Sequence, residues 1–241
     1  MKINQFEFDG IKSYDECGLY IEKRPAPTIP QRDYTKTHVP GRSGDVIQDN
    51  GCFLNISRTY KVGCSDLFMK FDEIKKMLAK TGYKKLSDSY DPGFFYYAAV
   101  TEATSFEEEL LNVGHANIVF DCEPYKYSNS GNTPINVSTN AGLTTALKNN
   151  YLFSALPKFK ISGDEGTSVT IMVNSKSYNF KFPTGENTVY IDSLSESCSW
   201  NSKNLNAGYN SESWPELLPG TNKICVIGAS DAVIYPQWRT I

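Results

Sequence analysis

The 241-residue chain carries 24 Lys and Arg residues against 27 Asp and Glu residues, a formal net charge of -3 at pH 7. This balance lacks the basic footprint of a nucleic-acid-binding domain, so we expect no nucleic-acid partner. No window approaches about 18 consecutive apolar residues, so no membrane insertion is predicted. The opening residues MKINQFEFDG lack the apolar core of a signal peptide, which predicts a protein made in the cytosol.

The first half carries mainly β patterns, interrupted by an arm and one helix. Residues 24–45 hold four prolines, and proline is excluded from central strands, so we expect an extended arm from Pro25 to Pro40. The glycines of GRSGD (41–45) fit the turn at a hairpin tip. Strand patterns follow in CFLNISRTYKVGC (52–64), FFYYAAVTEA (94–103) and HANIVFDCEPYKY (115–127).

Residues 65–82 repeat apolar side chains at helical spacing, which predicts one amphipathic helix packed on a sheet. Ser65 is expected as its N-cap, and Gly82 as the residue past its end. Its buried face is expected to contain Leu67, Phe68, Phe71, Ile74 and Leu78.

The composition changes near residue 130. SNSGNTPINVSTNAG (128–142) is rich in Ser, Asn and Gly, which predicts a linker or loosely held edge. We therefore expect domains at 1–130 and 151–241, separated by a linker or edge segment at 131–150. Short alternating strands such as SVTIMVN, YNFKF and TVYID predict a second domain that is a β-sandwich or jelly roll. KICVIG is expected to pair with DAVIYPQWRTI across the turn at 228–230, and Leu217 or Leu218 to cap the sandwich.

Motifs for catalysis or cofactor binding are missing. The six cysteines lie far apart without a C-x-x-C pair, which is typical of buried, reduced thiols. His38 and His115 lack the spacing of a zinc site. No nucleophile elbow, Walker A loop or dinucleotide fingerprint occurs. Scattered acids in the second half would be the only basis for a hydrolase, so we expect no enzyme, metal or cofactor.

Aromatic residues in the second half permit another function. Trp200, Tyr209 and Trp214 lie in a loop-rich stretch, where their faces would stack on a sugar ring, and this suggests a carbohydrate-binding module. Tryptophan is also a large core residue. We expect Trp238 in the core, while both interpretations remain open for the loop residues.

Six stretches occur in a specific order along nearly the whole chain: VPGRSGD, LFMKFDEIKKML, SDSYDPGFFYYAAV, IVFDCEPYKYS, WPELLPGTNKICVIG and IYPQWRTI. Their order and spacing resemble the distal tail protein (Dit) family of long-tailed phages that infect Gram-positive bacteria. The resemblance implies a mainly β fold, with an N-terminal β-sandwich-like domain carrying one helix and a projecting arm. It also implies a C-terminal galectin-like sandwich.

The same resemblance implies a structural role in the virion, after assembly in the host cytoplasm. Subunits would form a hexameric ring that joins the tail tube protein to the tail-associated lysin or spike, and in some phages holds receptor-binding proteins. The arm would wrap a neighbouring subunit. Its candidate contact residues are Arg32, Tyr34, His38 and Arg42.

Overall fold

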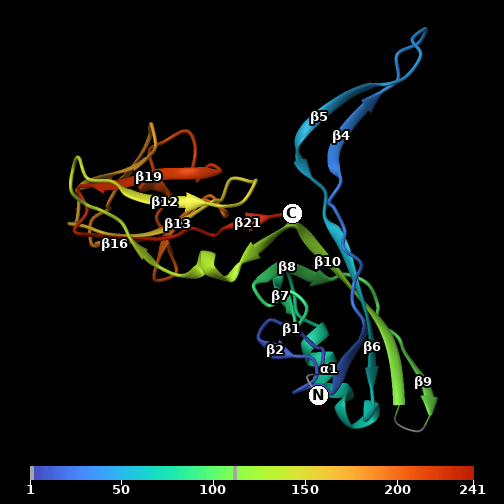
Figure 1. The fold of residues 1–241 in the computed structure, drawn as a ribbon. Helices are drawn as coiled ribbons and strands as arrows, with labels where there is room; N and C mark the ends of the chain where they lie inside the picture. Colours follow the sequence, from blue (N-terminus) through green and yellow to red (C-terminus); the bar gives the residue numbers. More distant parts are fainter. Residues whose placement is uncertain (1–2, 111–112) are drawn as a thin grey trace. The chain divides into compact units, whose positions relative to one another are not determined.

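The computed structural model describes residues 3–110 and 113–241, which form two compact units (Figure 1). The units divide between Lys126 and Tyr127, and Ile241 groups with the first unit. Segment 131–150 carries β11 (Ile135–Asn136) and β12 (Thr145–Asn149), each at the edge of a sheet in the second unit. This segment is therefore part of the second unit, because β11 pairs with β20 and β12 pairs with β19.

The first unit is built on one sheet with the strand order β2-β1-β7-β8-β10-β6-β3, and β9 and β21 also pair with β10. Phenylalanine, tyrosine and β-branched residues alternate inward along these strands and form the core with α1. The strands of the first unit are β1 (Phe6–Phe8), β2 (Ile11–Lys12), β3 (Leu19–Lys23), β6 (Ile56–Cys64), β7 (Lys84–Asp88), β8 (Phe94–Val100), β9 (Phe106–Leu110) and β10 (Val113–Ser128), whose last two residues belong to the second unit; β21 (Arg239–Thr240) also belongs to the second unit.

The predicted helix is present as α1 (Leu67–Leu78), with Leu67 and Ile74 buried as expected. Other details of the prediction are wrong. Phe68 and Phe71 are 64% and 41% exposed and Leu78 is only partly buried, whereas Met77 is fully buried, because the buried stripe is narrower than the apolar one. The C-cap is Ala79, so Gly82 is not the residue just past the end of the helix. The N-cap is Asp66 rather than Ser65, and it makes no side-chain capping hydrogen bond.

The predicted arm is a β-hairpin. β4 (Arg32–Thr37) and β5 (Val46–Phe53) form a separate two-stranded sheet (Figure 1). The extended segment does not end at Pro40, because β5 returns along β4. Residues 41–45 lie at the tip as predicted, and Gly41 and Gly44 both have φ of +82°. The side chains of β4 and β5 are exposed or only half-buried.

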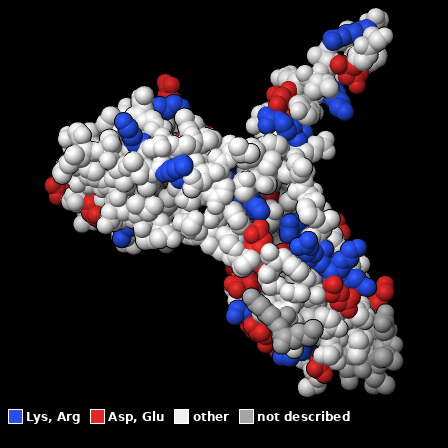
Figure 2. Space-filling view, in the orientation of Figure 1, with Lys and Arg blue, Asp and Glu red and all other residues white. Residues whose placement is uncertain are grey.

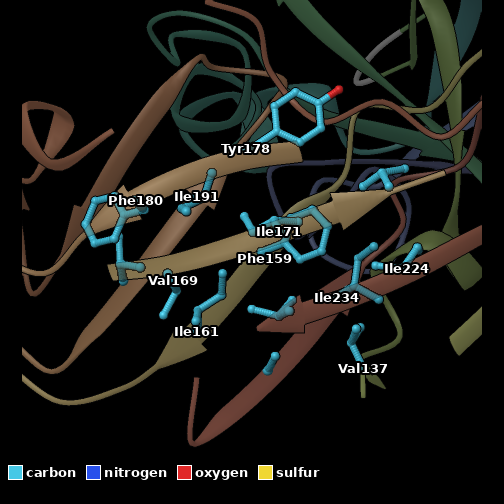
Figure 3. Close-up of a cluster of buried hydrophobic side chains, with 14 of the residues drawn as sticks. Val137, Phe159, Ile161, Val169, Ile171, Tyr178, Phe180, Ile191, Ile224 and Ile234 are labelled. Carbon is cyan, nitrogen blue, oxygen red and sulfur yellow. The ribbon is translucent and has the colours of Figure 1, made fainter. Parts of the chain in front are cut away.

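The second unit contains two facing sheets, ordered β11-β20-β13-β16-β17-β18 and β12-β19-β14-β15. Alternate side chains from both sheets meet between them (Figure 3). The predicted inward positions Val169, Ile171, Tyr178 and Phe180 are all buried. The remaining elements are β13 (Lys158–Ser162), β14 (Ser168–Val173), β15 (Lys176–Lys181), β16 (Thr188–Asp192), β17 (Ser197–Trp200), β18 (Lys203–Asn204), β19 (Gly220–Ile227), β20 (Asp231–Tyr235), and the 3-10 turns η1 (Asn129–Asn132) and η2 (Asn206–Gly208).

The predicted pairing of the last two long strands is wrong. β19 and β20 belong to different sheets, so the turn at 228–230 crosses from one sheet to the other. Ile224 of β19 and Ile234 of β20 both point into the shared core (Figure 3). Before β19, Leu217 is fully buried and exchanges two backbone hydrogen bonds of 2.9 Å with Ala155, whereas Leu218 is half exposed. Leu217 therefore closes the sandwich edge.

Gly131 provides a test of packing in the second unit. A Cβ there would collide with the Trp238 backbone nitrogen and lie 3.0 Å from Gln237 Cα. We expect Gly131→Ala to lower the free energy of unfolding by about 1–3 kcal/mol, because backbone cannot move aside cheaply. Denaturation followed by far-UV circular dichroism, to which both units contribute, measures this. The control is Gly93→Ala, whose Cβ would meet nothing within 4 Å; equal midpoints for the two variants would contradict the packing.

Candidate functional site

The base of the hairpin arm is held by an ion pair across its two strands. Arg32 donates from Nε and Nη2 to Asp49 Oδ2, at 2.9 and 2.8 Å, and its guanidinium lies 4.9 Å from the Phe53 ring centre. The Gly51 N–H donates to the other Asp49 oxygen at 2.8 Å. This N–H and the Arg32 guanidinium hold the pKa of the Asp49 carboxyl below its usual value. Arg32 thus acts within the hairpin and stiffens it.

The rest of the hairpin presents its side chains to solvent. Tyr34, Val46 and Ile47 are exposed apolar residues on a sheet with no core of its own. At the tip, His38 Nδ1 lies 3.4 Å from Asp45 Oδ1, and Arg42 lies in the turn between them in sequence. Apolar residues beside unpaired strand edges favour contact with another chain. The structure therefore brings Arg32, Tyr34, His38 and Arg42 onto one hairpin.

The sequence interpretation missed the returning strand β5 and with it Asp49, the partner of Arg32. The stretch VIQDNGCF has only a weak alternation, because neither face of the hairpin is buried. Its signal is indirect: two glycines at a tip, preceded by one β-rich run and followed by another.

The cysteine on the arm differs in exposure from the cysteines of the two cores. All six are free; Cys52 on β5 is exposed, and the other five are buried. Burial raises the pKa of the Cys122 and Cys198 thiols to about 12, and that of Cys17 to about 11. These buried thiols are unreactive at neutral pH, so Cys52 is a selective chemical probe of the arm.

The aromatic residues of the second unit fall into two groups. Tyr209 and Trp214 stack with ring centres 4.1 Å apart and planes 7° from parallel, and the Tyr209 hydroxyl donates to the Ser213 carbonyl at 2.6 Å. Burial raises the pKa of the Tyr209 hydroxyl well above its usual value. Trp200 lies apart from this stack, on β17, 5.5 Å from the Tyr190 ring. Trp238 is half-buried against the core.

Charge and metal chemistry add no further site within the described chain. Basic and acidic side chains are interspersed on the face shown in Figure 2. No group of three or more His, Cys, Asp or Glu side chains among the described residues is arranged to hold a metal ion. No helix in residues 3–110 or 113–241 is long and apolar enough to span a membrane.

Comparison with known proteins identifies the fold. No family model matches this sequence, and no curated protein matches it. Among solved structures, the Dit protein of SPP1 matches with a TM-score of 0.74 and 16% sequence identity, over 100% of both chains. That structure is described as a paradigm of the hub adsorption apparatus in phages that infect Gram-positive bacteria. The resemblance expected from the sequence is thus confirmed in the fold: from end to end, this chain has the fold of a phage Dit protein.

Proposed function

We propose that this chain is a structural, non-enzymatic subunit of a phage tail tip. The observation that carries the proposal is the full-length match to the SPP1 Dit fold, which covers both units rather than a single common domain. A fold alone does not fix function. The self-paired hairpin arm supports the proposal independently, because it is built for contact with another chain.

In this role the subunits form a closed ring, with six members as the expected number, at the end of the tail in the virion. Ring contacts are head-to-tail: the arm of one subunit packs on the body of the next, and rotation closes the set. The exposed Tyr34, Val46 and Ile47 gain burial in this contact. The ring joins the tail tube protein to the tail-associated lysin or spike, and provides an attachment point for receptor-binding proteins.

Cys52 tests the arm contact directly. In the isolated subunit a maleimide reagent is expected to label Cys52 alone, because the other five thiols are buried. In the assembled ring the labelling of Cys52 is expected to slow, since β5 is then covered. The control is a Cys52→Ser variant, which should show no fast labelling in either state. An equal Cys52 labelling rate in subunit and ring would contradict a role for β5 in assembly.

Sugar binding by the aromatic loop stays a prediction, now restricted to Tyr209 and Trp214, since Trp200 lies apart from their stack. Titration with cell-wall polysaccharide should change the tryptophan fluorescence of the wild type, and Trp214→Ala should remove that response. Trp200→Ala is the matched control and should retain it. No fluorescence response in the wild type would contradict sugar binding, and the Tyr209–Trp214 stack would then have only a structural role.

A further inference from the structure

The first unit contains a cavity of about 660 Å³. This volume lies within the range of about 300–1,000 Å³ typical of ligand sites. One wall comes from the proline-rich segment 24–29, which leads into the arm. The other walls come from β6, β7, the turn that joins β7 to β8, β8, Lys126 of β10 and Ile241, and include the aromatic rings of Tyr60, Tyr90, Phe94 and Tyr96.

Arg58 lies at this cavity in a position where a core residue is expected. It is on the inward face of β6, between the buried Ile56 and Tyr60, and its side chain is only 13% exposed. The guanidinium stacks over Tyr96, 4.6 Å from the ring centre. A buried cation is costly unless it is well paired, so its partners decide whether it is a structural group.

The partners of Arg58 do not satisfy it. Of its five N–H donors, Nη1 lies 3.5 Å from the Tyr96 hydroxyl and Nη2 lies 3.4 Å from Asp88 Oδ2. Both contacts are at the long limit of a hydrogen bond. Arg58 Nε is buried and has no hydrogen-bond partner.

The two acidic side chains that line the cavity, Asp88 and Asp91, are already engaged. Asp88 Oδ2 accepts the Tyr60 hydroxyl at 2.7 Å, and Oδ1 accepts the backbone N–H groups of Tyr90 and Asp91 at 2.9 and 3.1 Å. Lys126 pairs with Asp91 at 2.9 Å. The cavity therefore holds a guanidinium with donors left over, beside aromatic walls.

We propose that this cavity binds a carboxylate attached to an apolar group. Arg58 holds the carboxylate through Nε and one Nη, the forked geometry that guanidinium groups favour, and the aromatic walls receive the apolar part. The carboxylate comes either from a small organic acid or from an acidic side chain of a protein segment. This site is independent of the proposed hub function.

Calorimetric titration of the full chain at neutral pH tests the site with paired probes. Phenylacetate and phenylacetamide share a shape but differ in charge, as do the peptides acetyl-Leu-Glu-Leu-amide and acetyl-Leu-Gln-Leu-amide. We expect at least one acid to bind with a Kd on the order of 1 mM, and about tenfold more tightly than its neutral partner. Tighter binding of the acidic peptide indicates a protein segment, and tighter binding of phenylacetate indicates a small acid.

Two variants locate the binding. Arg58→Met keeps the side-chain length but removes the donors, and is expected to weaken binding of the acid about tenfold. Arg42→Met at the arm tip makes the same chemical change and should leave binding unaltered. Equal binding of acid and neutral probe by the wild type would overturn the proposal, whatever the stability of the Arg58 variant. So would an unchanged affinity in an Arg58→Met chain shown to be folded by circular dichroism.

Discussion

Replacing residues 33–52 with an Asn-Gly turn is expected to abolish ring assembly and leave a folded single subunit. Arg32 and Phe53 are paired across the base of the hairpin, so a two-residue turn joins them without distorting the sheet below. The removed residues bury almost nothing within the subunit, and none belongs to either core. We therefore expect the solution mass to fall to that of one subunit, with an unchanged melting temperature.

Point substitutions test whether assembly depends on the side-chain contacts of the hairpin and not only on its length. Ile47→Asp, at a residue 59% exposed on β5, is expected to weaken the ring, because a charge enters an apolar contact. Leu152→Asp makes a similar change at a residue 86% exposed in the second unit, and should leave assembly intact. A ring that survives the hairpin replacement would show that the arm is dispensable for assembly.

Phe120→Ala is expected to cost about 3–5 kcal/mol of the free energy of unfolding of the first unit, through lost burial and the cavity left behind. Phe120 is fully buried on β10, and its ring centre lies 5.1 Å from Phe8, 5.5 Å from Phe6 and 5.8 Å from Tyr60. The same substitution at Phe68, which is exposed on α1, should change stability by no more than about 0.5 kcal/mol.

The two units offer separate signals for this measurement. All three tryptophans (Trp200, Trp214 and Trp238) lie in the second unit, so tryptophan fluorescence reports on that unit alone. Far-UV circular dichroism reports on both units. Phe120→Ala should therefore move a denaturation transition seen by circular dichroism while the fluorescence midpoint stays fixed. A loss below about 1 kcal/mol would contradict the central place of Phe120 in the first core.

The sequence predicted the core residues best in strands that have one buried face and one solvent-exposed face. Val169, Ile171 and Phe180 alternate with polar residues, and this period of two determines which side chains fill the sandwich. The same alternation does not tell which strand is the neighbour. β19 and β20 both alternate, and their glycine turn suits a hairpin as well as a crossing between sheets, so the pairing was wrong.

The functional surfaces were less predictable, because their residues are not selected by burial. The arm was expected from its prolines, whereas the return strand β5 lacks a buried face to mark it. Tyr209 and Trp214 stack together, but Trp200, which belongs to the same loop-rich stretch of sequence, packs on Tyr190 instead. Arg58 leaves a signal in the sequence, a cation between inward-facing Ile56 and Tyr60, yet its unmet donors are visible only in three dimensions.

The solution mass of the purified protein, measured by light scattering after size exclusion with negative-stain images of the same fraction, tests the central claim most directly. The account predicts a closed hexameric ring with a central channel, built from 27.0 kDa subunits. A monomer at every concentration tested, with no rings in the images, would contradict it.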